Sequence, residues 1–425
     1  MPGLESTRAA AEVGMLSSLD YRLPQVLNFV TDRKEVTYYP LGGDQYRPVG
    51  VRVLTFQCSG LGLLDASTLT LSVQCHNNDP GTKLLKPLTC DLSCMISEIR
   101  LMLGGVEVER LSGYGRLQTM MNQGLSVQKR RNDADICFGV ADLGTDEVAN
   151  QGWAPVTIPA QTGVQVLHKI NSGITTQRLF LPLWALQAGG LTVEIMLVGA
   201  YSDALDSDPA MSQLWSWSNC MLHADVLRVD DEMMQSYSKF ILSGKNLLIP
   251  FKTTSVVQMS VSGPDYELAV PRQFARLNAV WVTFNRSASW STILKDGNHF
   301  YFPSASQNTV EASCQVGDKK FPEHTYKSLS QFIYRYHKAT GLDKSASHCA
   351  TVSRQSFANS NWITVFDLET VPQANHSGLN TSAGSIVISF KNVGTSAENY
   401  PTQAVITLFY DSIAEIGDSG VSVSY

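Results

Sequence analysis

The stretch from residue 97 to residue 124, SEIRLMLGGVEVERLSGYGRLQTMMNQG, contains two runs of alternating apolar and polar residues around a Gly-Gly pair. A two-residue loop of Gly104 and Gly105 supplies the positive φ angles that a tight hairpin turn requires. Side chains alternate between the two faces of a strand, so one face of the predicted hairpin is apolar and the other is charged. The stretch therefore predicts a β-hairpin that packs one face inward.

The Gly-Gly turn also sets the pairing of the two strands. It places Leu103 opposite Val106 and, three residues further from the turn, Arg100 opposite Glu109. We expect Arg100 and Glu109 to form a cross-strand ion pair worth up to about 1 kcal/mol. Glu107 and Glu109 would then point to solvent, where a charged outer face is a better interpretation than a pair of catalytic carboxylates.

After the hairpin the apolar spacing changes to that of a helix. Leu117, Met120 and Met121 follow the i, i+3, i+4 pattern, and Gly124 ends it. The segment 325–341 shows the same signal over a longer stretch. Its apolar positions are Leu329, Phe332, Ile333 and Tyr336, followed by Gly341. Both segments are therefore predicted to be helices with one buried side.

Composition limits the classes of protein that this chain can belong to. Its 425 residues suffice for two ordinary domains, and only 16% of them are charged. The net charge of -6 argues against a protein whose main task is to neutralise phosphates. The one dense basic cluster, Lys129 to Arg131, is interpreted as a solvated loop. We therefore expect no specific nucleic-acid binding.

The sequence contains no segment expected to cross a membrane and no secretory signal. The best apolar run, residues 191–201, is too short and contains Glu194. The first 24 residues lack a basic start followed by an apolar stretch. The cysteines are Cys58, Cys75, Cys90, Cys94, Cys137, Cys220, Cys314 and Cys349. Without a secretion signal we expect them to be reduced.

Short strand-like runs separated by Gly, Ser, Asn and Pro residues occur along both halves of the chain. The runs of the first half are 49–58, 69–75, 97–111, 164–170, 191–198 and 222–229. The runs of the second half are 246–260, 278–285, 309–316, 361–368, 385–391 and 403–413. The pattern is typical of an all-β protein with a few short helices.

The two series of runs correspond to each other in order. The matching segments are 69–75 with 278–285, the helix after Gly113 with 325–341, 191–198 with 385–391, and 224–233 with 408–417. Each half offers about eight strands, which is the number in a jelly roll. We predict two tandem eight-stranded jelly rolls, with an N-terminal arm at 1–44, the first roll at 45–238 and the second at 239–425.

No motif for catalysis, a cofactor or a metal ion emerges from the sequence. There is no phosphate-binding loop and no nucleophile elbow, and the C-x3-C pair of Cys90 and Cys94 has no second pair. Trp215 and Trp217 lie in a loop-like stretch before the last strand of the first half. Three interpretations stay open for them: a plug at the end of the sandwich, a contact between subunits, or a platform for a sugar.

Four segments in order resemble the double-jelly-roll major capsid proteins of polinton-like viruses, virophages and adintovirus-type elements. They are IRLMLGGVEVERLSGYGRLQTMM (99–121), LFLPLWALQAGGLTVEIMLV (179–198), LHADVLRVDDEMMQSYSKFILSGKNLLIPF (222–251) and SGLNTSAGSIVISFKN (377–392). The resemblance runs from about residue 45 to the C-terminus. Each motif is loose by itself, but their shared order makes the signal specific.

The resemblance implies a structural protein of the virion and not an enzyme. Three chains would form a pseudo-hexagonal capsomer, and capsomers would tile an icosahedral shell around double-stranded DNA. Neighbouring capsomers and penton or minor capsid proteins would be its partners, and it would be made inside the host cell. Loops such as 139–163 and 369–384 would form outer towers, and the arm with residues 21–30 would reach a neighbour or the inside of the shell.

Two other functions are compatible with a β-sandwich of this composition. The first is a carbohydrate-binding or carbohydrate-processing protein, for which exposed tryptophans and paired carboxylates would matter. The second is a minor virion protein at a vertex or fibre. A single roll would be expected of the second, so the matching halves favour the major capsid protein.

Overall fold

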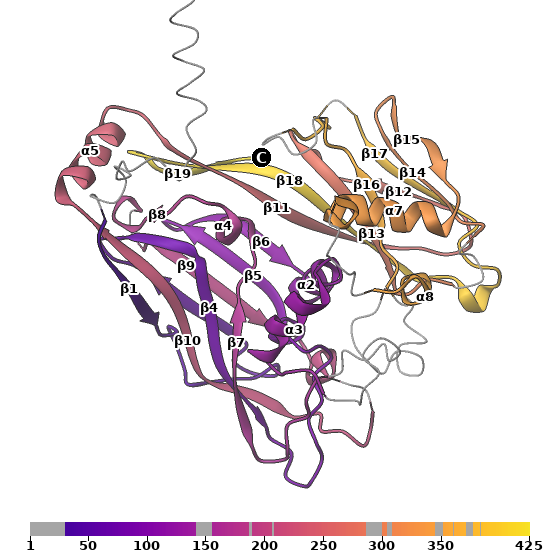
Figure 1. Ribbon diagram of the computed structural model, residues 1–425, viewed down its shortest axis with the longest axis horizontal. Coiled ribbons are helices and arrows are strands. Elements are labelled where there is room, and N and C mark those ends of the chain that lie inside the picture. The colour runs from indigo at the N-terminus through magenta and orange to yellow at the C-terminus, as the bar shows by residue number, and fades with distance from the viewer. Residues whose placement is uncertain are drawn as a thin grey trace, which may run out of the picture.

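The chain folds into two β-sandwiches that lie next to each other (Figure 1). The first runs from indigo to magenta and the second from salmon to yellow. The computed structural model describes residues 30–141, 155–186, 189–205, 208–285, 300–303, 308–344, 352–359, 361–370, 377–382 and 384–425. The predicted segment 21–30, apart from its last residue, lies outside the described residues. So do parts of the predicted loops 139–163 and 369–384.

The first sandwich consists of two antiparallel sheets. Its strands are β1 (Val30–Tyr38), β2 (Gln45–Tyr46), β3 (Val53–Cys58), β4 (Leu63–Asn77), β5 (Ile96–Leu103), β6 (Val106–Ser112), β7 (Gly163–Lys169), β8 (Leu181–Pro182), β9 (Leu191–Leu197) and β10 (Trp215–Val229). One sheet has the order β1-β10-β4-β7, with β2 paired to β10 and β8 paired to β4. The other sheet has the order β3-β9-β5-β6.

The second sandwich repeats this plan. Its strands are β11 (Leu247–Ser260), β12 (Tyr266–Val270), β13 (Leu277–Asn285), β14 (Glu311–Val316), β15 (Lys319–Tyr326), β16 (Thr364–Asp367), β17 (Ile386–Lys391), β18 (Gln403–Gly417) and β19 (Gly420–Ser424). One sheet has the order β11-β18-β13-β16, with β19 paired to β18, and the other has the order β12-β17-β14-β15.

The two halves have the same topology. In each sandwich the first strand pairs with a long strand near the end of that half, β1 with β10 and β11 with β18, and the remaining strands follow in the same positions. Every correspondence predicted from the sequence joins topologically equivalent elements: β4 with β13, β9 with β17, and β10 with β18. Each half is a jelly roll of two four-stranded sheets with short additional strands. The predicted double jelly roll is therefore confirmed.

Helices occupy the connections between strands. The described helical segments are η3 (Leu92–Met95), α2 (Tyr114–Asn122), α3 (Val127–Asp135), α4 (Gly173–Thr176), η4 (Leu183–Ala185), η5 (Tyr201–Ala204), α5 (Asp231–Leu242), α7 (Leu329–Thr340), η7 (Leu342–Lys344), α8 (Arg354–Asn359) and η8 (Ala397–Asn399). Helix α2 follows β6 in the first roll, and α7 follows β15 in the second. The predicted correspondence of these two helices is therefore also confirmed.

Helix α7 shows how the sequence fixes such an element. The hydroxyl of Ser328 accepts a hydrogen bond from the Gln331 amide and caps the first turn. Gly341 ends the helix with a φ of 76°, a conformation that glycine adopts without strain. Phe332 and Tyr336 are buried, as the spacing predicted, and α7 lies against β16.

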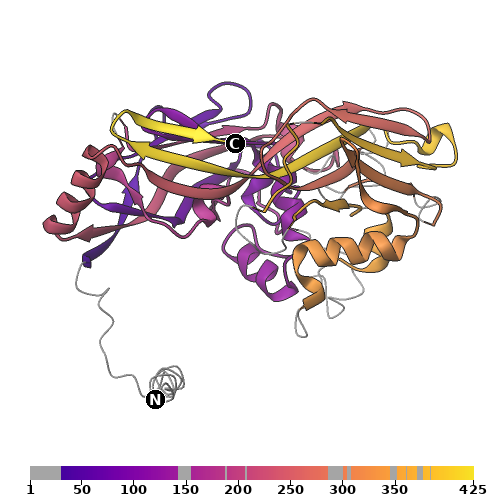
Figure 2. The ribbon, with the colours of Figure 1, turned by 90° about the horizontal axis from the view of Figure 1, so that it is seen from above.

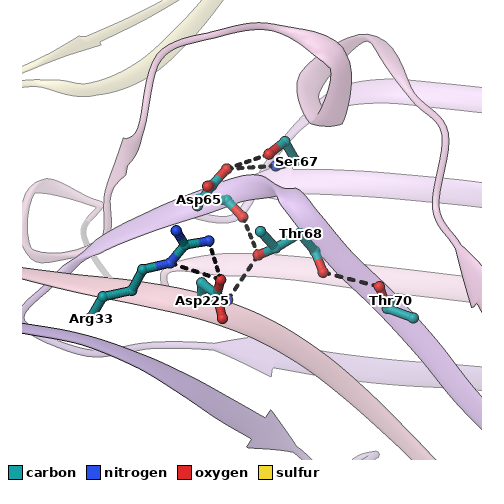
Figure 3. A network of polar contacts seen from close by, with 6 residues as sticks. All are labelled: Arg33, Asp65, Ser67, Thr68, Thr70 and Asp225. Carbon is teal, nitrogen blue, oxygen red and sulfur yellow. Dashed lines mark hydrogen bonds and ion pairs between the residues drawn. The ribbon is translucent and has the colours of Figure 1, made fainter.

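Strand β1 lies within the predicted arm of residues 1–44 and pairs along most of its length with β10. Figure 3 shows one anchor of this pairing. The Arg33 guanidinium donates to Asp225 Oδ2, with an Nε distance of 2.9 Å. The Asp225 amide donates in turn to Thr68 Oγ1 at 2.8 Å, and that hydroxyl donates to the carbonyl of Asp65 on β4.

The basic cluster that was predicted to be a solvated loop is helical, and so is the acidic segment that follows β10. The basic cluster at Lys129 lies on α3, where Ser126 caps the helix and Lys129 pairs with Asp133 one turn later. Asp230 is the N-terminal cap residue of α5, and Asp231 opens its first turn. Acidic residues favour the start of a helix because they interact well with the helix dipole. The predicted boundary at residue 238 consequently falls inside α5.

Candidate functional site: the joint between the two rolls

The register of the opening hairpin differs from the predicted one. Leu103 opposes Val106 as expected, but a β-bulge follows, and Leu101 pairs with Glu109. The predicted cross-strand pair of Arg100 and Glu109 is therefore wrong. A bulge adds one residue to one strand and shifts every later side chain to the other face. Glu109 consequently shares a face with Leu101.

Arg100 forms its ion pairs with other carboxylates. Its Nη2 lies 2.6 Å from Glu107 Oε2, and its Nη1 lies 2.9 Å from Glu194 Oε2 on β9. All three side chains are partly exposed, so this cluster adds little stability. Arg100 and Glu107 thus lie on the solvent face of the sheet, as the sequence predicted.

Glu109, in contrast, is buried between the two rolls. Its Oε1 accepts hydrogen bonds of 2.8 Å from the Gly173 amide of α4 and from the Thr253 hydroxyl of β11. Its Oε2 accepts one of 3.1 Å from the Ile174 amide. Burial raises the pKa of Glu109 above its usual value, and these donors partly offset the shift. One carboxylate therefore binds elements of both rolls.

The contact beside Glu109 is very close. A Cβ atom on Gly173 would lie 2.1 Å from the carbonyl oxygen of Lys252 on β11. Only a residue without a side chain lets α4 approach the second roll to this distance. The neighbouring donor Thr253 is itself buried. Gly173 and Thr253 thus fix the spacing of the rolls at this point.

Arg116 of α2 makes a second connection. Its guanidinium donates to Thr283 Oγ1 on β13, with an Nη2 distance of 2.9 Å. Its central carbon also lies 4.4 Å from the ring centroid of Phe300. Removal from water lowers the pKa of Arg116 to about 9, which leaves the group charged at neutral pH. A third contact joins Gln123 Nε2 to Asn361 Oδ1 at 2.9 Å.

A polar cleft of about 620 Å³ runs along the joint beside Glu109. Its lining residues come from β6 of the first roll and from β11, β18, the segment before β13 and the C-terminal residue of the second. Those that carry hydroxyl or guanidinium groups include Arg110, Thr254, Arg272, Tyr410 and Tyr425. The Arg110 guanidinium pairs with Glu98 at 2.9 Å. The cleft thus lies between two domains that are joined at Glu109.

The two tryptophans that the sequence placed in a loop-like stretch lie inside the first roll, on β10. Trp215 and Trp217 have no exposed surface, and their ring centroids lie 6.0 Å apart. Trp215 Nε1 donates to the carbonyl of Tyr201 at 3.3 Å, and Trp217 Nε1 lies 3.3 Å from Met95 Sδ. Of the three interpretations, this position agrees with the plug, because neither ring presents a surface to a sugar or a partner.

The part of the chain that the structure describes contains no cluster of residues suited to hold a metal ion. Its seven cysteines are buried and form no disulfide with one another, and Cys349 lies outside the described residues. Burial raises the pKa of the Cys58 and Cys220 thiols to about 12, so both are protonated at neutral pH. Among the described helices, none is long and apolar enough to span a membrane.

Glu109, Gly173 and Arg116 were not recognised as functional from the sequence. A signal for the bulge was nevertheless present, because the apolar spacing lengthens from two residues between Val106 and Val108 to three between Val108 and Leu111. An extra residue in the strand explains this change. The partners of Glu109 could not be foreseen, since Thr253 is 144 residues away.

Comparison with known proteins identifies the fold. No protein-family model matches the sequence, and no curated protein matches it. A chain of the PBCV-1 virus capsid superimposes with a TM-score of 0.62 at 12% identity, over 95% of this chain and 98% of that one. The Faustovirus major capsid protein gives a TM-score of 0.62 at 9% identity, over 95% and 93%.

A chain of the Sputnik virophage gives a similar result. The TM-score is 0.61 at 10% identity, over 96% of this chain and 91% of that one. These matches extend over both rolls and over nearly the full length of each compared chain. The chain therefore has the double-jelly-roll fold found in viral major capsid proteins.

Proposed function

We propose that the chain is a viral major capsid protein that assembles into homotrimeric, pseudo-hexagonal capsomers. The observation that carries this proposal is the repetition of one strand order in both halves of a single chain. Three such chains around a threefold axis would place six similar rolls in a ring. The trimer would then have the outline of a hexagon, which can tile an icosahedral shell.

The joint between the rolls supports this role. A hexagonal outline requires a constant angle between the two rolls of one chain. Glu109 joins α4 to β11, and Arg116 joins α2 to β13 at a separate place. Two connections at different positions restrain rotation better than either could alone. We infer that these residues set the geometry of the capsomer.

The surroundings of the capsomer follow from charge and composition. A net charge of -6 suits a shell that encloses double-stranded DNA without binding specific sequences. Neighbouring capsomers and penton or minor capsid proteins would be its partners, and the assembled virion would be its location. The chain would be made inside the host cell. Its task would be structural and not catalytic.

The domain division is also part of the proposal. We propose that the first roll begins at β1 and ends with β10, that α5 links the rolls, and that the second roll begins with β11. This keeps the two predicted rolls but moves the start of the first from residue 45 to residue 30. The reason is that β1 occupies the same place in its sheet as β11 does in the second roll.

The mass of the purified protein tests the proposal. Light scattering during size exclusion should give about three times the chain mass of 46.6 kDa. Interfaces of permanent assemblies bury about 2,000–5,000 Å² or more, so the trimer should persist on dilution. A protein that stays monomeric at high concentration would contradict the proposal. Binding on a glycan array by such a monomer would instead favour the carbohydrate-binding alternative.

A further inference from the structure

Helix α5 connects the two rolls and projects from the end of the first one (Figures 1 and 2). Apolar side chains recur along one of its sides. They belong to Met233, Met234, Tyr237, Phe240 and Ile241. Only Ile241 is buried, and no other described helix or strand packs extensively against α5.

This arrangement calls for a further partner. Isolated helices shorter than about 12–15 residues are marginal in water, and a surface helix gains its stability by packing an apolar side. Yet Tyr237 is 40% exposed and Phe240 39%. The apolar side of α5 is thus left partly exposed by the described residues, and we expect a further segment to cover it.

Other exposed apolar residues lie at the same end of the first roll. Leu63 of β4 pairs with Leu227 of β10 and with Pro182 of β8, so the segments preceding β4 and β8 lie close to the start of α5. These segments carry Leu61, which is 79% exposed, and Phe180, which is 43% exposed. We call the set of Leu61, Leu179, Phe180, Tyr237 and Phe240 the apolar end. Apolar side chains that are exposed at one end of a domain in this way indicate an interaction site.

The N-terminal part of the chain leaves the sheet beside this surface. The first described residue, Val30, pairs with Val229, and α5 begins two residues later at Asp231. The ion pair between Arg33 and Asp225 fixes β1 at this position (Figure 3). In Figures 1 and 2 the beginning of β1 accordingly lies close to α5. Everything before Val30 is therefore tethered next to the apolar end.

The sequence that precedes Val30 is suited to cover an apolar surface. Six of the nine residues in YRLPQVLNF, Tyr21–Phe29, are apolar or aromatic or proline. Pro24 favours an extended backbone at the residue before it. Nine extended residues reach roughly 30 Å. The 12 residues of α5 span only about 18 Å, so the segment is long enough to follow the whole helix.

We propose that residues Tyr21–Phe29 dock on the apolar end of the same chain and pack along α5. The covalent connection to β1 favours the chain's own segment over a segment from a second copy. A segment that begins within a few residues of its site has an effective concentration in the millimolar range, which a second copy reaches only when it is assembled. The docked segment would cover apolar surface that otherwise promotes aggregation.

Limited proteolysis of the full-length protein tests the proposal. Trypsin cleaves after Arg22, inside the docking segment, and after Arg8, outside it. The cleavage rate at each of the two bonds is compared with the cleavage rate at the same bond in a synthetic peptide of residues 1–29. We expect cleavage at Arg22 to be at least about tenfold slower than in the peptide, and cleavage at Arg8 to be unchanged. Equal, peptide-like rates at both bonds would overturn the proposal.

A pair of variants on α5 connects the protection to this helix. Tyr237→Asp places a charge on the apolar side and should bring the Arg22 rate back to that of the peptide. Gln235→Asp adds the same charge on the opposite side of the helix and should leave the protection intact. Both positions are exposed, so neither change disturbs a core. Protection of Arg22 that survives Tyr237→Asp would contradict docking on α5.

Co-expression distinguishes the chain's own segment from that of a second copy. One chain lacks residues 1–29 but keeps α5 intact, and the other keeps its N-terminus but carries Tyr237→Asp. Docking within one chain leaves Arg22 unprotected in the mixture. Protection of Arg22 would mean that the segment binds α5 of another copy and would overturn the assignment. The result does not depend on the oligomeric state, so it is separate from the test of capsomer assembly.

Discussion

Glu109 illustrates how one side chain connects two domains. Its carboxylate accepts hydrogen bonds from Gly173, Ile174 and Thr253, which belong to different rolls. A buried donor that loses its acceptor costs about 1–3 kcal/mol. Removal of this carboxylate would leave three donors without their partner. The stability of the joint therefore depends on a residue that looks like one of several surface glutamates in the sequence.

The raised pKa of Glu109 predicts a pH dependence. A carboxyl group with a raised pKa in the folded protein contributes stability that is fully present below its unfolded pKa, about 4.3, and is lost as the pH rises through the folded pKa. Glu109→Gln cannot titrate. The free energy of unfolding of the wild type should therefore fall relative to that of the variant as the pH rises above about 4.

Urea unfolding of both proteins across this pH range provides the measurement. The measured quantity is the difference in the free energy of unfolding between wild type and variant, and its change with pH is compared with the prediction. The absolute stability of the variant therefore does not matter. Other titrating groups are common to both proteins and cancel. A difference that is constant with pH, or that favours the wild type at high pH, would refute the raised pKa.

Gly173 gives a steric prediction at the same place. Gly173→Ala would bring a methyl group to 2.1 Å from the Lys252 carbonyl, so the two rolls must move apart. We expect a loss of about 1–3 kcal/mol in the free energy of unfolding. Gly43→Ala is a matched control, because a Cβ there meets nothing within 4 Å. Equal effects of the two changes would show that the contact is not tight.

Among the elements, α7 and the opening hairpin show what the sequence could predict. The spacing of apolar residues and the final glycine predicted where α7 ends, whereas the predicted segment 325–341 begins four residues before the helix does at Leu329. The turn at Gly104 and Gly105 was also correct, with φ angles of 55° and 84°. The pairing beyond the bulge was not, because local alternation cannot show that a strand carries an extra residue.

Strand β1 was missed for a different physical reason. Its sequence, VTDRKEVTY, is mostly polar, and most of its side chains are exposed. Hydrophobic alternation identifies a strand only when one face is buried. Backbone pairing with β10 holds β1 in place, and pairing between distant segments leaves no periodic signal in the sequence.

Helix α7 provides a prediction about packing. Phe332 is fully buried beside Trp362, with ring centroids 4.8 Å apart. Phe332→Ala should lower the free energy of unfolding by about 3–5 kcal/mol because it opens a cavity. Tyr334 on the same helix is 55% exposed. Tyr334→Ala should therefore change the free energy of unfolding by only about 0.5 kcal/mol or less. Chemical denaturation monitored by fluorescence measures both, and similar losses would contradict the assigned packing.

The molecule as a whole is a duplicated roll. The duplication could be predicted because equivalent elements recur in the same order, even though their sequences have diverged. The relation between the rolls could not be predicted, since it depends on contacts such as Arg116 with Thr283, which are 167 residues apart. The order of equivalent elements along the chain thus predicted the architecture. The contacts that join the two rolls became visible only in the structure.

Electron microscopy of the purified full-length protein tests the central claim most directly. If three chains place six similar rolls around a threefold axis, class averages along that axis should show a six-lobed, nearly hexagonal particle. The threefold map should accommodate three copies of the double jelly roll with the joint at Glu109 unchanged. Single two-lobed particles, or assemblies of another symmetry, would contradict the account.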